Sequence, residues 1–438
     1  MSWDFSTEPE FQEKLDWIDD FVREEVEPLD LAFPDQHYEI AGPGLTGVLE
    51  PLKARVKDRG LWACHLEPEL GGQGYGQLKL ALMNELLGRS GWAPRVFGTQ
   101  APDTGNAEII AKYGTEEQKA TYLLPLLNGE MFSCYSMTEP QAGSDPKMFT
   151  TRAERDGDEW VINGEKFFSS NARVSSFFIV MAITNPDVSA YRGMSMFLVP
   201  ADTPGINIVR NVATMYGDAE RGSHAWIKYE NVRVPATNLL GGEGQAFVIA
   251  QTRLGGGRIH HAMRSIAVCN QAFDMMCQRA LSRHTQGSLL ADKQLVQGQI
   301  TESWMQIQQL RFMVLHTAWL IDQRTAAGDV SSAGVRKEIA ACKVLAARAI
   351  HDVVYRAIHL HGALGMSQDT PLARMWQHAP TMGIVDGPTE VHVATVAKQV
   401  LKEHQPYEGT WPPYMLPERT EAARARFAEA LEHEVGNL

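Results

Sequence analysis

The sequence predicts a mostly α-helical fold with a central β domain. The segments before residue 130 and from about residue 245 to 404 carry apolar side chains at helical spacing. Residues 131–240 instead form short β-rich runs separated by turn dipeptides. We therefore expect four segments along the sequence: an N-terminal helical domain (1–130), a middle β-barrel or sandwich (131–240), a C-terminal four-helix bundle (241–408), and a Pro-rich and helical tail (409–438).

Two capping patterns delimit helices in the first domain. Thr7 is followed three residues later by Glu10, and Thr115 by Gln118, which is the spacing of a capping box. The second of these helices should end just before Gly129, because glycine favours the left-handed conformation after a helix.

Turn dipeptides and strand-forming runs organise the middle segment. The pairs Asp156-Gly157 and Asn163-Gly164 are both expected to form turns between strands. The strands expected after them cover residues 177–183, 194–199 and 225–234. In the C-terminal segment, the long helices expected for the bundle cover about residues 245–285, 292–327 and 332–361.

Composition excludes several classes of protein. A net charge of −13 disfavours binding to nucleic acid, whose phosphates attract basic surfaces. No apolar run reaches the ~20 residues of a membrane helix, and the acidic N-terminus does not resemble a signal peptide, so we expect a cytoplasmic protein without a membrane span. Five scattered cysteines without a CxxC pair predict neither a disulfide framework nor a metal cluster.

Several motifs occur in a fixed order along the chain. Residues 135–145 read Tyr-Ser-Met-Thr-Glu-Pro-Gln-Ala-Gly-Ser-Asp, and residues 162–171 read Ile-Asn-Gly-Glu-Lys-Phe-Phe-Ser-Ser-Asn. Shorter motifs cover residues 70–74, 114–119 and 232–235. Together they resemble the acyl-CoA dehydrogenases over roughly residues 11–404. The resemblance implies a helical–β–helical fold, an FAD cofactor and dehydrogenation of an acyl-CoA.

Three further runs, at residues 234–238, 253–261 and 386–392, resemble the subgroup of family members 10 and 11. That subgroup is associated with long, branched or 4-hydroxylated acyl chains. The resemblance implies α-proton abstraction and β-hydride transfer to flavin N5, which yields a trans-2-enoyl-CoA. It also implies an electron-transferring flavoprotein as acceptor and a homodimer or homotetramer.

Asp386 is the candidate catalytic base, because it occupies the position of the family's Glu-Gly-Thr glutamate. Its side chain is shorter than glutamate by one methylene, on the order of 1.5 Å. Two alternatives remain open: Asp386 could cap the helix that begins near Pro388, or Glu390 could be the base. Some relatives carry the base one residue before an arginine on the preceding helix, but this chain has Gly257 there.

The resemblance also implies the residues that bind FAD. Donors would come from the first motif and an aromatic surface from the second, and Pro388 and Glu390 would help to hold the flavin. The residues of the two motifs are Met137, Thr138, Gly143, Ser144, Phe168 and Ser170. Phe168 replaces the usual tryptophan, and its alternative interpretation is a core aromatic on a strand.

A second set of residues is implied to reach the cofactor of an adjacent subunit. Arg283 and Gln286 belong to a segment that would extend to the flavin pyrophosphate, which a guanidinium can bind through two oxygens. His359 and Gly362 lie in a small-residue turn that would pass over the same cofactor. The alternatives are a solvated charge for Arg283 and a structural role for His359.

Substrate contacts are expected at Ser144, Gly387 and Arg258. Arg258 follows three glycines that would leave space for a bulky or hydroxylated acyl chain, although it could also pair with a surface acid. His260 and His261 have no metal-ligand partners at useful spacing and are interpreted as structural.

Two other functions compete with the dehydrogenase. A flavin oxidase on the same fold, of the acyl-CoA oxidase or nitroalkane oxidase type, would consume oxygen without an added acceptor. A non-catalytic scaffold, with or without flavin, would act as a binding partner, and the presence of Asp386 with the flavin-contact motifs argues against it.

Overall fold

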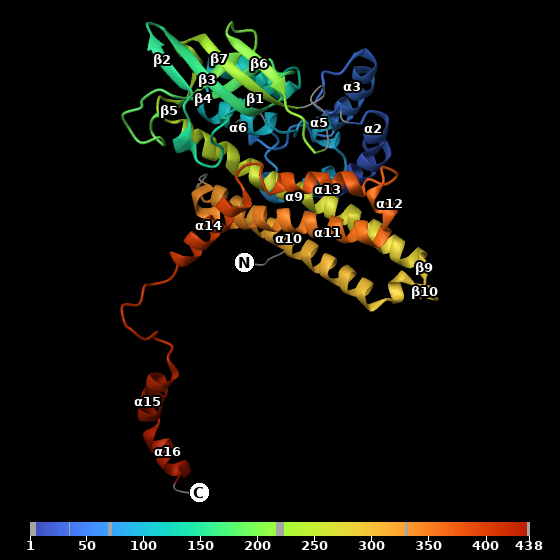
Figure 1. Ribbon diagram of the computed structural model, residues 1–438, viewed down its shortest axis with the longest axis vertical. Helices are drawn as coiled ribbons and strands as arrows, with labels where there is room; N and C mark the ends of the chain where they lie inside the picture. Colours follow the sequence, from blue (N-terminus) through green and yellow to red (C-terminus); the bar gives the residue numbers. More distant parts are fainter. Residues whose placement is uncertain (1–5, 35, 69–71, 216–222, 329–331, 436–438) are drawn as a thin grey trace. The chain divides into compact units, whose positions relative to one another are not determined.

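The computed structural model describes residues 6–34, 36–68, 72–215, 223–328 and 332–435 (Figure 1). The motif at residues 70–74 lies partly outside the described residues. Contacts divide the chain into two units, Met1–Val396 and Ala397–Leu438. The first unit contains helical, β and helical segments in the order that the sequence predicts.

The first five α-helices form one core around the buried face of the first helix, whereas the sixth and the eighth pack into a second cluster with the middle segment. Phe11, Leu15 and Ile18 lie on that face, as their spacing predicts. The α-helices are α1 (Pro9–Phe21), α2 (Glu27–Ala32), α3 (Pro43–Asp58), α4 (Gly76–Leu87), α5 (Ala93–Val96), α6 (Asp103–Tyr113), α7 (Glu116–Gln118) and α8 (Leu124–Asn128). Two π-helical turns, η1 (Val22–Val26) and η3 (Lys119–Leu123), continue α1 and α7.

One of the two predicted capping boxes is confirmed and the other is wrong. The Thr115 hydroxyl accepts from the Gln118 N–H at 3.2 Å, the Gln118 amide oxygen accepts from the Thr115 N–H, and Gly129 is left-handed with φ 78°. At the first helix, however, Glu8 is the N-cap, and the Thr7 hydroxyl donates to the Glu8 carbonyl. A proline at the first helical position moves the helix start, because its fixed φ already suits that position.

The middle segment folds into an eight-stranded sheet. The strands are β1 (Ser133–Ser136), β2 (Arg152–Asp156), β3 (Glu159–Ser170), β4 (Phe177–Ile183), β5 (Met194–Pro200), β6 (Ile206–Asn211), β7 (His224–Pro235) and β8 (Leu239–Leu240). Their order is β6-β7-β3-β1-β4-β5-β8, and β2 pairs with both β3 and β4. Strands β3, β1, β4 and β2 therefore form a closed circuit, as in a barrel.

The three predicted strands are confirmed, and β4 is buried on both faces. Phe177 and Ile179 pack into one hydrophobic cluster with residues of α6 and of the helix that follows the sheet, whereas Phe178 and Val180 pack into a second cluster with β3 and β7. The sequence of such a strand is a continuous apolar run, because neither of its faces is exposed to water.

The prediction of a turn at Asn163-Gly164 is wrong, although the turn at Gly157 is confirmed. β3 continues through the pair with a register shift, and the Asn163 side chain accepts from the Asn231 N–H at 2.8 Å. Gly164 has φ +148°, and a Cβ there would lie 2.5 Å from the Thr151 hydroxyl oxygen. The glycine thus permits a bulge and close packing instead of a turn.

The three long helices expected in the C-terminal segment are confirmed. The helices are α9 (Ala246–Ser282), α10 (Gln294–Ala326), α11 (Arg336–His361), α12 (Ala363–Met366), α13 (Leu372–Met382) and α14 (Thr389–Leu401). α9, α10 and α11 share a core that includes Ile266, Leu310 and Val353, and α13 covers α11. A short hairpin of β9 (His284–Thr285) and β10 (Ser288–Leu289) joins α9 to α10.

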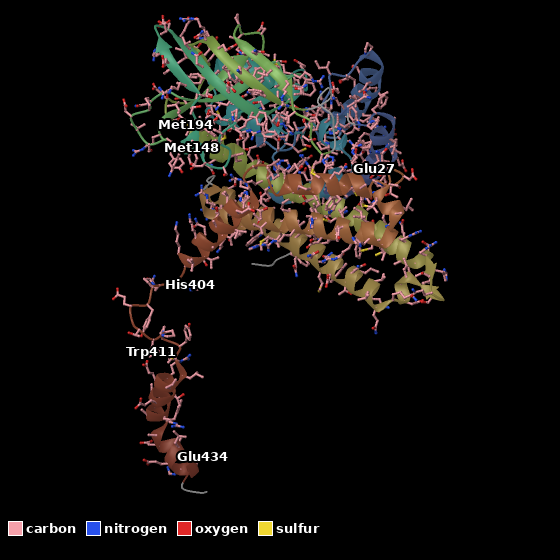
Figure 2. All side chains as sticks on the ribbon, in the orientation of Figure 1. Glu27, Met148, Met194, His404, Trp411 and Glu434 are labelled. Carbon is pink, nitrogen blue, oxygen red and sulfur yellow. The ribbon has the colours of Figure 1, made fainter. Side chains whose placement is uncertain are left out.

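The second unit is a tail with two helices, α15 (Leu416–Arg426) and α16 (Ala428–Val435). α15 buries no residue, and Figure 2 shows the tail's side chains, including Trp411, projecting from a single ribbon. All five cysteines of the chain are free thiols. Within the described residues, no helix is both long and apolar enough to cross a membrane.

Candidate active site

Asp386 lies between α13 and α14 in an unusual backbone conformation. Its φ is +54°, a left-handed value that is uncommon for a residue with a side chain, and Gly387 follows with φ +103°. The Asp386 carbonyl accepts from Arg258 Nε at 2.8 Å and lies 3.3 Å from His392 Nε2. These two contacts hold the backbone of the loop, and strained backbone of this kind clusters at functional sites.

The Asp386 carboxylate faces α9. Its Oδ2 lies 3.5 Å from His261 Nε2, and a Cβ added to Gly257 would lie only 2.7 Å from the same oxygen. Gly257 and His261 are one helical turn apart, so they present one face to the carboxylate. Burial lowers the pKa of His261 to about 4, although the nearby carboxylate opposes this shift. The imidazole is therefore neutral near pH 7.

Two cationic side chains, the buried Lys343 and the partly buried Arg258, belong to the same neighbourhood. Burial lowers the pKa of Lys343 to about 8, the Asp386 carboxylate acts against this, and Lys343 Nζ donates to the Met382 carbonyl at 2.7 Å. Burial also lowers the pKa of Arg258, again opposed by Asp386. The electrostatic effect of Asp386 on both side chains shows that they lie near its carboxylate.

Neither alternative role weighed for this loop gains support from the contacts. No backbone N–H of α14 donates to the Asp386 carboxylate within the described part of the chain, and Thr389 N donates instead to the Gly383 carbonyl. Glu390 is exposed on the first turn of α14. The Asp386 side chain thus points toward α9 and does not cap the helix.

The two motifs expected at the flavin lie side by side. Tyr135 of β1 pairs with Ser170 of β3, and Phe167 N donates to the Thr138 carbonyl at 2.9 Å. Phe168 has φ +59° and is 50% exposed, so the interpretation as a core aromatic is wrong. Ser170 Oγ lies 2.9 Å from His224 Nδ1.

The loop after β1 is the candidate site for the polar edge of a flavin. Among the residues that the structure describes, no acceptor is found for four backbone N–H groups, those of Met137, Thr138, Gly143 and Ser144. The exposed ring of Phe168 lies next to the pairing between this loop and β3. Unpaired donors beside an exposed aromatic surface fit the polar edge and the flat face of an isoalloxazine ring.

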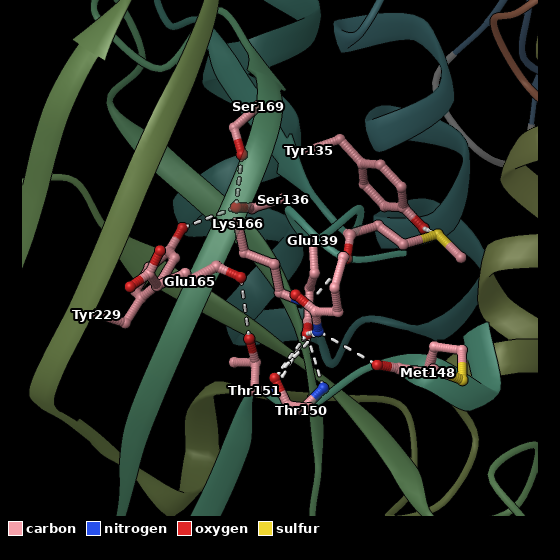
Figure 3. Close-up of polar contacts among 12 residues, drawn as sticks. Tyr135, Ser136, Glu139, Met148, Thr150, Thr151, Glu165, Lys166, Ser169 and Tyr229 are labelled. Atoms are coloured by element: carbon pink, nitrogen blue, oxygen red, sulfur yellow. Dashed lines mark hydrogen bonds and ion pairs between the residues drawn. The ribbon is translucent and has the colours of Figure 1, made fainter. Parts of the chain in front are cut away.

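A buried ion pair connects the two motifs (Figure 3). Lys166 Nζ lies 2.9 Å from Glu139 Oε1, the two side chains are 0% and 1% exposed, and Lys166 also donates to the Met137 carbonyl at 2.8 Å. The backbone N–H groups of Thr150 and Thr151 donate to Glu139. Burial alone would raise the pKa of the Glu139 carboxyl, but Lys166 and these hydrogen bonds hold it at about 2. The pair therefore stays charged near pH 7.

Arg283, Gln286, His359 and Gly362 are not brought to Asp386 within one chain. Gln286, with φ 49°, lies in the turn between β9 and β10, and Gly362, with φ +65°, ends α11. Figure 1 shows β9, β10 and α12 together at one end of the long helices, away from the loop that follows α13. Their contribution to the cofactor of an adjacent subunit stays a prediction.

Sequence reasoning missed His261, Glu139 and Lys166. His261 follows Gly257 by four residues, and this spacing could have identified it, since residues one turn apart share a helix face. Glu139 and Lys166 each lie inside one of the two motifs, where a charge on an inward-facing position is a signal of pairing.

A β barrel between two helical segments is the architecture of the acyl-CoA dehydrogenase type of oxidoreductase. Models of the acyl-CoA dehydrogenase N-terminal, middle and C-terminal domains match residues 8–130, 134–232 and 244–401. The chain belongs to this family, whose members are FAD-dependent flavoproteins.

Individual relatives support the same assignment. "Probable acyl-CoA dehydrogenase FadE2" of Mycobacterium tuberculosis is 42% identical over 89% of this chain and 94% of its own length. "Acyl-CoA dehydrogenase family member 11" of Gallus gallus is 44% identical over 80% of this chain, but this chain spans only 45% of that protein. A solved putative acyl-CoA dehydrogenase from Mycobacterium abscessus matches with a TM-score of 0.83 at 36% identity, covering 91% of this chain and all of that one.

Removal of one partner of the buried pair should destabilise the β domain. Lys166→Met leaves the Glu139 carboxylate buried without a counter-charge, and we expect the free energy of unfolding to fall by about 3–5 kcal/mol. The measurement is chemical denaturation, together with the FAD content of the purified protein, which should also fall because the donor loop loses its anchor.

Lys228→Met is the matched control, because Lys228 of β7 pairs with Glu165 of β3 at 3.4 Å with both side chains over a third exposed. Exposed pairs contribute between about 0 and 1 kcal/mol, so this variant should change stability little. Equal losses for the two variants would contradict a special role for the buried pair.

Gly257→Ala should displace the Asp386 carboxylate, because the new methyl group would lie 2.7 Å from Oδ2. We expect flavin reduction by an acyl-CoA to slow by roughly ten- to a hundredfold with bound flavin retained, since a small misplacement of a catalytic group has effects of that order. Gly47→Ala on α3, where a Cβ has no neighbour within 4 Å, is the control. An unchanged rate in Gly257→Ala would show that the carboxylate position is not critical.

Proposed function

We propose that this chain catalyses α,β-dehydrogenation of an acyl-CoA thioester to a trans-2-enoyl-CoA, with Asp386 as the base that removes the α proton. The observation that carries the proposal is the placement of the Asp386 carboxylate: it leaves a left-handed loop, faces the glycine backbone of α9, and lies 3.5 Å from the His261 ring. FAD, when bound, would accept the hydride that leaves the β carbon.

The chain's own residues orient this carboxylate. Arg258 and His392 contact the Asp386 carbonyl and thereby set the direction of the side chain. Neutral His261, 3.5 Å from Oδ2, restricts its rotation without adding a full positive charge that would weaken the base. Gly257 allows the carboxylate to approach the helix backbone, which compensates for the short arm of aspartate.

The FAD site would combine residues of two subunits. Within one chain, the free N–H donors of residues 137, 138, 143 and 144, the Phe168 ring and the Ser170 hydroxyl would bind the isoalloxazine, and Pro388 and Glu390 would flank it. The residues proposed to reach the cofactor of the adjacent subunit are Arg283, Gln286, His359 and Gly362. Such a shared site requires a homodimer or homotetramer.

For the substrate, we propose contacts with Ser144, Gly387 and Arg258, and long, branched or 4-hydroxylated acyl chains as the class. Arg258 Nε has one hydrogen, which it donates to the Asp386 carbonyl. The terminal guanidinium nitrogens are therefore the donors that we propose for a ligand. An electron-transferring flavoprotein is the proposed acceptor for the electrons.

Asp386→Asn should retain FAD but lose flavin reduction by at least about a hundredfold, because an amide cannot accept the α proton. The measurement is anaerobic mixing of the purified variant with a panel of acyl-CoAs while the visible flavin absorbance is followed. Asp386→Glu, which keeps a carboxylate, should retain more of the rate, and Glu390→Gln should lose far less than Asp386→Asn.

A near wild-type rate in Asp386→Asn would remove Asp386 from the mechanism. Bound flavin that no acyl-CoA reduces in the wild-type protein would overturn the proposed reaction. Oxygen consumption by the wild-type protein with substrate and no added acceptor would indicate an oxidase.

A further inference from the structure

A β-bulge in β3 precedes the Ser170 hydroxyl that is proposed to bind the flavin. The ladder between β3 and β7 shifts register after Lys166, so that two residues of β3, Phe167 and Phe168, lie opposite one residue of β7. Phe168 has φ +59° there, and half of its side chain is exposed. Beyond the bulge the ladder resumes, and Ser170 lies directly opposite His224. Bulges of this kind re-aim side chains and are frequent next to active sites.

Ser170 and His224 project from the face of the sheet opposite to the buried cluster of β7. Ala225 and Ile227 lie in that cluster, and side chains alternate along a strand, so His224 points the other way. Directly opposed residues have their side chains on one face of a sheet. Tyr135 of β1 pairs with Ser170 from its other side, so Ser170 lies in the middle of a row across three strands.

The Ser170 hydroxyl has one hydrogen-bond partner within the residues that the structure describes. This partner is His224, whose Nδ1 lies 2.9 Å from Ser170 Oγ. One residue further on, Asn171 N donates to the Ser223 carbonyl at 2.6 Å. The Phe168 ring packs edge-on against the imidazole with the two ring centroids 6.4 Å apart. Strand pairing and ring packing therefore hold the imidazole beside the hydroxyl.

The protonation state of His224 determines what the hydroxyl can offer to a ligand. Burial lowers the pKa of His224 below its ordinary value, so the ring is neutral near pH 7. A neutral imidazole has one N–H and one bare nitrogen, and Nδ1 is an acceptor when the hydrogen is on Nε2. In that tautomer the Ser170 hydroxyl donates to Nδ1, and the lone pairs of Oγ remain available to a ligand.

The direction of this hydrogen bond matters because reduction changes the polarity of a flavin. The ring nitrogen that receives the hydride is an acceptor in oxidised FAD and an N–H donor in reduced FAD. A serine hydroxyl can donate to the oxidised ring after a simple rotation. Against the reduced ring it must accept, so its own hydrogen needs a second acceptor. A buried hydroxyl donor without an acceptor carries a desolvation penalty.

We propose that His224 is a positioning residue that stabilises reduced FAD relative to oxidised FAD. Its Nδ1 accepts the hydrogen of the Ser170 hydroxyl and thereby directs the lone pairs of Oγ toward the N–H of the reduced ring. The inference rests on the proposed function, because Ser170 contacts the isoalloxazine only if the flavin site is as proposed. His224 acts through Ser170 and requires no contact of its own with the substrate.

The test is the two-electron reduction potential of the bound FAD, measured by equilibration with a redox dye. His224→Phe keeps a ring but has no acceptor. The ratio of the affinities for reduced and oxidised FAD should fall about tenfold, which lowers the potential by about 30 mV. His224→Leu is a second variant with the same expected shift. His224→Asn can place its amide oxygen near the position of Nδ1 and should restore most of the wild-type potential.

Ser170→Ala tests whether His224 acts through the hydroxyl. In the Ser170→Ala background, His224→Phe should cause no further shift of the potential, because two groups in one hydrogen-bonded network are not additive. Trp226→Phe is the matched control. Trp226 lies two residues along β7, and its Nε1 donates to Glu165 Oε2 at 2.9 Å. The variant loses one contact between the same two strands but none with Ser170, so the potential should not change.

An unchanged potential in both His224→Phe and His224→Leu overturns the inference. A shift as large in the Ser170→Ala background as in the wild-type background also overturns it, because the effect would then be a general disturbance of the strand. If acyl-CoA reduces the bound FAD in either of these cases, the proposed function stands and only the inference fails. If the wild-type protein binds no FAD, the proposed function fails and the inference fails with it.

Discussion

The buried pair of Glu139 and Lys166 is the interaction on which the geometry of the flavin side depends. Lys166 belongs to β3 and Glu139 to the loop after β1, and the pair, together with the Lys166 contact to the Met137 carbonyl, fixes that loop against the strand (Figure 3). Because the carboxylate also accepts from Thr150 and Thr151, the desolvation of both charges is offset by hydrogen bonds. The N–H donors of the loop are thereby held at the C-terminal end of β1, between β3 and β4.

The second constraint is the face of α9 that meets Asp386. Helix α9 contacts α4, α6, α10 and α11, so it joins the bundle to the N-terminal helices, and α10 adds a second contact with α4. Along it, Gly256 and Gly257 let Glu108 and Asp386 approach the backbone from different directions, and His261 follows one turn later. Two glycines inside a helix reduce its stability, and the close approach of two carboxyl groups gives a physical reason for them. Apolar contacts with the bundle core stabilise α9 instead.

Local rules predicted the elements well wherever a single interaction decided the outcome. The capping box at Thr115 and the left-handed Gly129 involve neighbours in sequence, and both are present. Asn163-Gly164 failed for the opposite reason: in isolation the pair favours a turn, but the pairing of β3 with β7 and the packing on Thr151 keep it extended as a bulge. At α1, Pro9 occupies the first helical position, so the helix starts after Glu8 and not after Thr7 as the capping pattern predicts.

The sequence by itself determined the order of helical and β segments and the two motifs at the flavin, because periodicity and motif spacing are properties of the chain alone. It also singled out Asp386 through its resemblance to a family. Only the tertiary structure decided what surrounds that residue. His261 and Lys343 come from segments far apart in the sequence, and burial, which lowers the pKa of both side chains, exists only once those segments pack together.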